Sequence, residues 1–117
     1  MNNPKVFNQN NLFKKYVNSC VCNVKAAVRL YEESKDLTAP PAPAVLAYIC
    51  QAHACAKQVQ LLAGLLEINQ YNNFYASFIE LNNVFMRFAA TGHNKEDVSA
   101  KYDIFIGAFD KLDFERA

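Results

Sequence analysis

Cys50, His53 and Cys55 are the densest group of side chains in the sequence that could bind a metal ion. A zinc site needs three or four such ligands converging at about 2.0–2.3 Å. On a helix, Cys50 and His53 share a face because they are spaced three residues apart, whereas Cys55 points to a different side. Two ligands do not complete a site, so we predict no metal and no cofactor. We interpret the cysteines as small apolar fillers in helices.

His53 also begins a second pattern, His53-Ala-Cys-Ala-Lys57. Histidine phosphotransfer domains are four-helix bundles of similar length, with an exposed histidine on a long helix and a lysine shortly after it. The segment is similar to this pattern in outline, but Lys57 lies one position late and the small residues that usually follow are absent. The resemblance implies phosphoryl transfer through His53. The alternative is a solvated histidine in a polar strip opposite the apolar face, which comprises His53, Lys57, Gln60, Gly64 and Glu67.

Arg87 and His93 form an Arg-x5-His pair. Helical ribonucleases of the HEPN class use an arginine and a histidine at about this spacing to polarise a phosphate and to move a proton. The pair resembles that motif, and the resemblance implies metal-independent RNA cleavage. The sequence departs from the pattern in two places: Phe88 stands where a polar residue is common, and His93 follows Gly92 in a predicted turn. The alternative is a surface arginine and a turn histidine.

Other kinds of catalytic site are absent from the sequence. It contains no Gly-x-Ser-x-Gly nucleophile motif, and its three glycines are too few for a phosphate-binding loop. No Glu-x-x-His pair of the di-iron type occurs. Twelve basic residues are balanced by eleven acidic ones, so we expect no general binding of nucleic acid. We therefore assign no catalytic residue.

Four segments that would position these side chains have apolar residues at steps of three and four, the period of one helix face. We predict helices from about Asn11 to Ser34, from Pro43 to about Glu67, from an N-cap at Asn72 or Asn73 to Thr91, and after an N-cap at Asn94. The predicted core residues are Phe13, Val17, Cys20, Val24, Ala27 and Tyr31; Val45, Ile49, Ala52, Ala56, Val59, Ala63 and Leu66; Phe74, Phe78, Leu81, Phe85 and Phe88; and Val98, Tyr102, Phe105, Phe109 and Leu112.

The connections between these segments predict the topology. Pro40, Pro41 and Pro43 make residues 35–43 a linker, and Pro43 suits the first turn of the next helix. The two later connections are short, which makes consecutive helices antiparallel neighbours. We predict an all-α, antiparallel four-helix bundle with a Pro-rich linker between the first two helices. Residues 1–10 would form a flexible N-terminal arm, and residues 11–117 a single domain.

The location in the cell is inferred from two features. The first residues have no apolar signal region, and no apolar run approaches the ~20 residues that span a bilayer. We therefore expect a soluble cytoplasmic protein that does not enter a membrane. The four cysteines then favour free thiols over a disulfide framework.

The last two helices have more apolar residues than one face requires, and this surplus predicts a contact with another protein. The extra residues are Tyr75, Ile79, Met86, Ile104 and Ile106. We expect a small non-enzymatic interaction module that binds a protein partner or itself as a homo-oligomer, with a dimer as the expected form. Bacterial or phage inhibitors, immunity proteins, adaptors and chaperones have this size and class. The alternatives are a bundle with ordinary aromatic surface, a HEPN-like ribonuclease and a His53 phosphotransfer domain.

Overall fold

The computed structural model describes residues 4–33, 43–91 and 95–112, with the backbone alone at 4–10, 88–91 and 95–97. These residues form the helices α1 (Pro4–Glu33), α2 (Pro43–Leu66), α3 (Asn72–Thr91) and α4 (Lys95–Asp110), and no strand occurs among them. The predicted all-α four-helix bundle is confirmed. Pro43 is the first residue of α2, as its fixed φ and missing N–H favour. The rest of the predicted linker lies outside the described residues.

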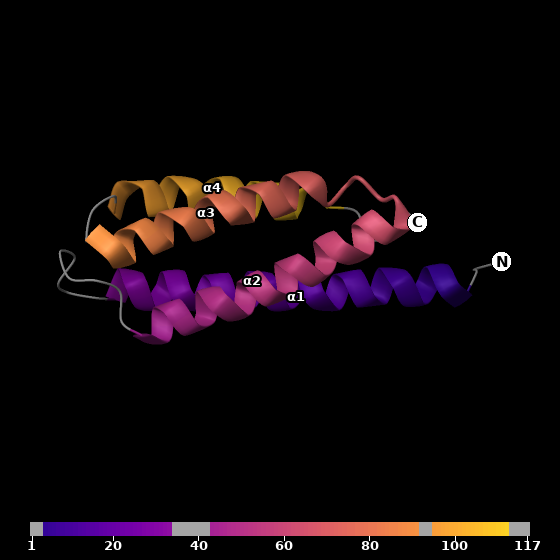
Figure 1. The fold of residues 1–117 in the computed structure, drawn as a ribbon, viewed down its shortest axis with the longest axis horizontal. Helices are drawn as coiled ribbons and strands as arrows, with labels where there is room; N and C mark the ends of the chain where they lie inside the picture. Colours follow the sequence, from indigo (N-terminus) through magenta and orange to yellow (C-terminus); the bar gives the residue numbers. More distant parts are fainter. Residues whose placement is uncertain (1–3, 34–42, 92–94, 113–117) are drawn as a thin grey trace.

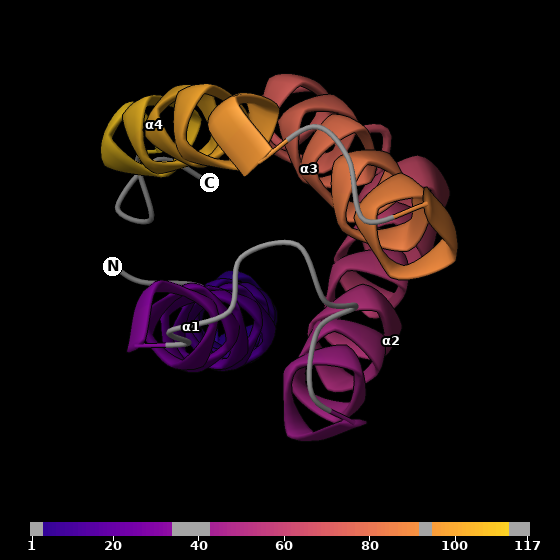
Figure 2. The same ribbon diagram turned by 90° about the vertical axis from the view of Figure 1, so that its left-hand side faces the viewer.

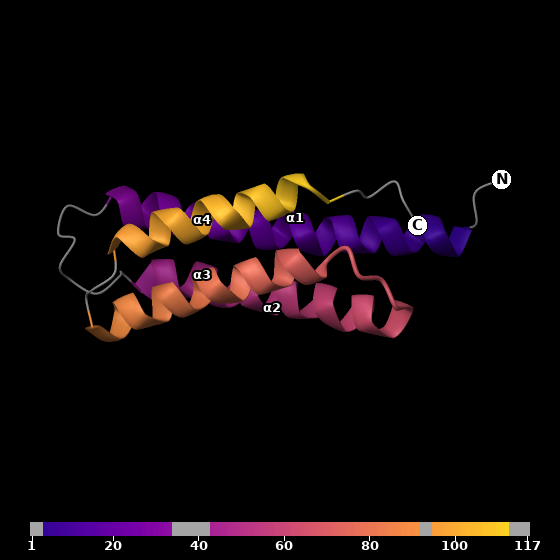
Figure 3. The ribbon, with the colours of Figure 1, turned by 90° about the horizontal axis from the view of Figure 1, so that it is seen from above.

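The four helices run up and down along one long axis (Figure 1). The bundle measures 55 × 20 × 20 Å. α1 packs closely with α2, α2 with α3, and α3 with α4. Within the described residues, α1 and α4 do not pack as closely as these three pairs. The view along the long axis shows a wider space between the ribbons of α1 and α4 (Figure 2). The view from above shows that the N-terminal end of α1 extends past the other helices (Figure 3).

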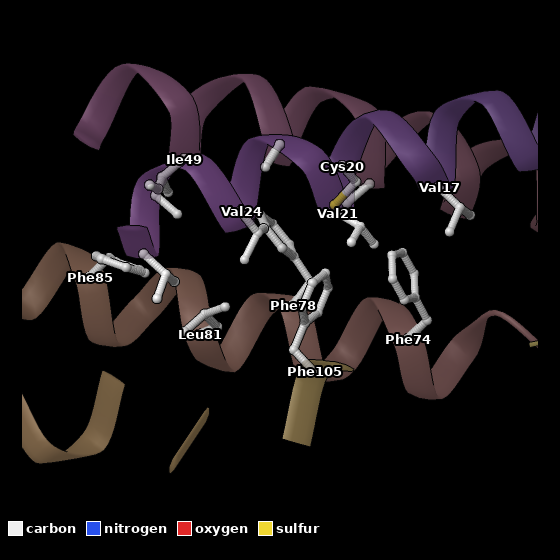
Figure 4. Packing of buried hydrophobic residues seen from close by; sticks show 14 of the residues in the cluster. Val17, Cys20, Val21, Val24, Ile49, Phe74, Phe78, Leu81, Phe85 and Phe105 are labelled. Carbon is white, nitrogen blue, oxygen red and sulfur yellow. The ribbon is translucent and has the colours of Figure 1, made fainter. Parts of the chain in front are cut away.

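The core joins all four helices. Valines of α1 point towards phenylalanines of α3 across the bundle, with Ile49 of α2 and Phe105 of α4 beside them (Figure 4). The Phe74 and Phe105 rings lie 5.1 Å apart, which ties α3 to α4. Each such side chain contributes about 1.5–3 kcal/mol when it is fully buried. The predicted core is confirmed for the following buried residues: Phe13, Val17, Cys20, Val24, Ala27, Tyr31, Val45, Ile49, Ala52, Ala56, Val59, Ala63, Phe74, Phe78, Leu81, Phe85, Val98 and Phe105.

The start of α1 differs from the prediction. The helix begins at Pro4 instead of Asn11, so residues 4–10 are helical and do not form the predicted flexible arm. Proline is favoured in the first turn of a helix because its N–H would have no partner there. Asparagine has a low helix propensity, but Lys5 and Gln9 are good helix formers, so the composition of this segment is compatible with a helix. The polar residues at 8–11 were therefore a poor guide to the boundary.

The end of α2 is closed by a Schellman motif. The N–H of Ile68 donates to the carbonyl of Ala63 at 2.9 Å, and the N–H of Glu67 donates to the carbonyl of Gly64 at 3.4 Å. Glu67 has a φ of 57°, the left-handed conformation that glycine usually supplies at this position. Ile68 packs against the core, as the motif requires. Leu66, predicted as core, is 37% exposed because the chain turns away at this point.

The boundaries of α3 and α4 agree with the sequence to within a residue. α3 ends at Thr91, as predicted, and α4 begins directly after the predicted cap Asn94, which lies outside the described residues. At the start of α3, the carbonyl of Tyr71 accepts the N–H of Tyr75 at 2.9 Å. Tyr71 therefore precedes the first helical residue, one position before the predicted cap at Asn72.

Candidate interaction surface

The outward side of α2 carries a second periodic row of residues besides the buried one. Its inner side is buried at Val45, Ile49, Ala52, Ala56, Val59 and Ala63. The outer row follows the same alternation of three and four residues, and all of its members are exposed: Ala47, Gln51, Ala54, Gln58, Leu61 and Leu65. Leu61 is 54% exposed and Leu65 is 81% exposed. The helix thus has an apolar or uncharged row on both sides.

This surface is uncharged over nearly its whole length. Lys57 is the only charged residue among the 24 of α2. The solvent side of α1, in contrast, carries exposed Lys14, Lys15, Lys25, Arg29, Glu32 and Glu33. Ion pairs join Arg29 to Glu33 within α1, and Lys101 to Glu80 between α4 and α3, both at 3.2 Å. A helix that only faces solvent on its outer side normally carries charged residues there, so the uncharged outer row of α2 is unusual.

The exposed apolar side chains concentrate on the first two helices. Of the eight large apolar side chains exposed among the described residues, six belong to α1 and α2: Leu12, Leu30, Tyr48, Leu61, Leu65 and Leu66. Single exposed apolar residues such as Leu12 and Leu30 are ordinary on a protein surface, whereas Leu61 and Leu65 lie about one turn apart on the same side of α2 and indicate an interaction site.

The five contact residues predicted from the sequence differ in their exposure. Ile79 and Ile106 pack against the core, and Tyr75 is half-buried. Met86 is 38% exposed and Ile104 is 53% exposed. Ile104 lines a groove between α3 and α4 whose lining includes none of the other four.

That groove has a volume of about 620 Å³. Its small residues are Ala76, Ser77, Gly107 and Ala108, and Glu80 and Lys111 supply charge. The hydroxyl of Ser77 donates to the carbonyl of Phe74 at 2.8 Å, a bond within its own helix. Neither histidine nor cysteine lines the groove.

His53 is half-buried, with its ring 5.9 Å from that of Phe78 and nearly parallel to it. It therefore faces α3, and only part of its side chain is exposed to solvent. Gln60, from the same predicted strip, is also half-buried, and its Oε1 atom is buried without a hydrogen-bond partner among the described residues. At ~100° per residue the strip lies about a quarter turn from the buried seam, and not opposite it. The opposite side is the row that ends at Leu61 and Leu65.

The four cysteines are all unpaired and occupy different environments. Cys20 is buried, Cys55 is half-buried, and Cys22 and Cys50 are exposed. Burial raises the pKa of the Cys20 thiol well above its usual range, and it also raises the pKa of Cys55. A raised pKa suppresses the reactive thiolate, so these two are packing residues and poor nucleophiles. No three side chains of His, Cys, Asp or Glu come together as a metal site within the described residues.

Arg87 is exposed on α3, and its predicted catalytic partner His93 lies outside the described residues. The Arg87–His93 pair therefore stays a prediction from the sequence.

The outer row of α2 was missed from the sequence, although two signals were available: the absence of charge apart from Lys57, and the run Leu61-Leu62-Ala63-Gly64-Leu65-Leu66.

None of the helices, within the part of the chain described, is long and apolar enough to cross a membrane. Comparison with protein-family models, with curated proteins and with solved structures gives no match.

Proposed function

We propose that this chain is a non-enzymatic protein-interaction module that acts by presenting an apolar helix surface to a protein partner, either another copy or a different protein. The outer row of α2 is the principal contact surface. The residues predicted on α3 and α4 form a secondary candidate through Met86 and Ile104, the two that are exposed. We place the protein in the cytoplasm, with no cofactor.

One observation carries this proposal: Leu61 and Leu65 stand exposed on a helix whose outward side is free of charge apart from Lys57. Leaving a leucine side chain in water forgoes about 1.5–3 kcal/mol of burial free energy. A helix that only needed to close a bundle would carry charged residues on that side, as α1 does. Covering the outer row with another protein recovers the burial free energy.

The test compares two surfaces with matched substitutions. Leu61→Lys with Leu65→Lys places charges on the α2 surface, and Met86→Lys with Ile104→Lys does the same on the α3–α4 surface. All four positions are exposed, so both variants should keep the helical circular dichroism of the wild type. Each is immobilised and exposed to an extract of the source cells, and the retained proteins are identified by mass spectrometry.

The expected result is a protein, or the chain itself, that is retained by the wild type and lost with the α2 variant. If the protein is instead lost only with the α3–α4 variant, the contact surface lies at Met86 and Ile104, which were predicted from the sequence. Identical retention by all three would contradict an apolar interaction surface. Arg87→Ala tests the ribonuclease alternative in a separate RNA-cleavage assay. Cleavage by the wild type that is lost in this variant would show that the protein is an enzyme and would contradict the non-enzymatic proposal.

A further inference from the structure

Charge is distributed unevenly along the chain, although its total is nearly balanced. The first acidic residue is Glu32, and the five charged residues before it are all basic: Lys5, Lys14, Lys15, Lys25 and Arg29. The remaining 86 residues hold seven basic and eleven acidic ones. The balance of the total predicts no binding of nucleic acid, but a total hides an asymmetry of this kind. The α1 helix is therefore a basic element of an otherwise acidic chain.

The structure gathers the charges of α1 on one exposed side, which we name the basic face. At ~100° per residue, seven residues fall within a sector of about 100°: Asn11, Lys14, Lys15, Asn18, Cys22, Lys25 and Arg29. All seven are exposed, and they follow α1 for ~27 Å along the length of the bundle (Figure 1). A surface that serves only solubility mixes charges of both signs. The basic face carries four positive charges, and the first negative ones, Glu32 and Glu33, come after its end.

Arg29 has an ion-pair partner in its own helix, but the pair is weak. The Nε atom of Arg29 donates to Oε1 of Glu33 at 3.2 Å, and the two side chains are 81% and 60% exposed. An ion pair this open to water contributes little. Phosphate oxygens bind a guanidinium through two parallel hydrogen bonds, so they can replace the carboxylate. Arg29 therefore counts with the three lysines as a cation available to a phosphate.

The absence of apolar residues from the basic face separates the kinds of anionic partner. A protein contact normally has a buried aromatic or aliphatic anchor, and a helix bound to a membrane surface buries an apolar side in the bilayer. The basic face contains no aromatic or large aliphatic residue. The exposed Leu12 and Leu30 lie about a third of a turn from its centre, and the apolar side of α1 is buried in the core. Non-specific binding of nucleic acid, in contrast, needs only cations that neutralise phosphates, helped by amide donors such as Asn18.

We infer that the basic face of α1 binds the phosphate backbone of a nucleic acid without reading its sequence. A duplex carries one negative charge per ~1.7 Å of its axis, so the row from Lys14 to Arg29, ~22 Å long, meets phosphates over its whole length. At most four phosphates are neutralised, so affinity should be modest and fall by about 100-fold between 50 and 200 mM salt. This activity is separate from the α2 surface and goes beyond the proposed function.

The experiment measures the fluorescence anisotropy of a labelled DNA duplex of about 20 base pairs, titrated with the purified chain at about 50–200 mM salt. Lys14→Gln with Lys25→Gln removes two charges from the basic face. Lys57→Gln with Lys111→Gln is the matched control, because it removes two exposed charges elsewhere and gives the same net charge. A polyglutamate peptide and vesicles that contain phosphatidylserine are titrated in the same way, and circular dichroism checks that every variant is folded.

We expect the wild type to bind the duplex, with a slope of about −3.6 for log K against log salt. The basic-face variant should lose at least about tenfold in affinity at low salt and about 2 from the size of that slope, whereas the control should lose less than about threefold. Absence of binding at low salt, or equal losses in the two variants, would overturn the inference. Tighter binding of polyglutamate or of the vesicles would replace nucleic acid with an acidic protein or a membrane. None of these results changes the retention experiment on α2, so the two proposals fail separately.

Discussion

Replacing Glu67 by glycine should stabilise the fold, because this residue closes α2 in a conformation that costs other residues free energy. Its φ is 57°. An L-residue in the left-handed region loses roughly 1–2 kcal/mol, whereas glycine loses nothing there. Glycine has more freedom in the unfolded chain, which offsets about 0.4–1 kcal/mol of that gain. The net expectation is an increase of about 0.5–1 kcal/mol in the free energy of unfolding.

The assay is urea and thermal unfolding followed by circular dichroism, at one protein concentration so that self-association does not change the comparison. A gain of this size raises the melting temperature by about 4 °C in a domain of this length. Glu67→Ala is the control: it removes the same side chain but keeps a Cβ, so the strain stays and stability should change by less than about 0.5 kcal/mol. If Glu67→Gly were no more stable than Glu67→Ala, the backbone conformation would not be the source of strain.

Three further predictions follow from the core and the helices. Gly64 is exposed within α2 with nothing within 4 Å of an added Cβ, so Gly64→Ala should raise the free energy of unfolding by about 0.5–1 kcal/mol; an unchanged urea midpoint would contradict this. Phe78 is fully buried against His53 and Phe105, so Phe78→Ala should lower that free energy by about 3–5 kcal/mol in urea titration. Burial raises the pKa of Tyr71 from 10.0 to about 12. The neutral phenol is thus favoured in the fold: its stabilisation is complete below pH 10 and is lost as pH rises to 12, by up to about 1.4 kcal/mol per pH unit. Between pH 10 and 12 the free energy of unfolding of Tyr71→Phe should therefore fall less steeply than that of the wild type. An equal slope in the two proteins would contradict the raised pKa of Tyr71.

The inner faces of the helices could be predicted because their apolar residues repeat with the helical period. The row from Val45 to Ala63 is buried, and so is the row from Phe74 to Phe85. Burial of these rows is a property of local spacing, and it needs no knowledge of which helix lies opposite.

The candidate site could not be predicted in the same way, because exposure of an apolar residue depends on which neighbours are present. Ile79 and Ile106 belong to surplus apolar rows, yet neighbouring helices cover them. Leu61 and Leu65 were not predicted as exposed, because local spacing does not show which apolar residues of α2 the neighbouring helices leave uncovered. Their exposure of 54% and 81% follows from the arrangement of the four helices.

Spacing on a helix also misplaced His53. Steps of three and four place His53 on the same side of α2 as Lys57 and Gln60. That side lies about a quarter turn from the buried row, and not opposite it. The contact with Phe78 shows that this side faces α3. The start of α1 at Pro4 was missed for a different reason, since asparagines lower the helix propensity of a segment without excluding a helix there.

The most direct test of the account is the retention experiment with the wild type and the Leu61→Lys, Leu65→Lys variant, each immobilised and exposed to the same cell extract. The account predicts that the wild type retains a protein, or the chain itself, that the variant does not retain, while both keep the same helical circular dichroism. Equal retention by the two would contradict a contact through the outer row of α2.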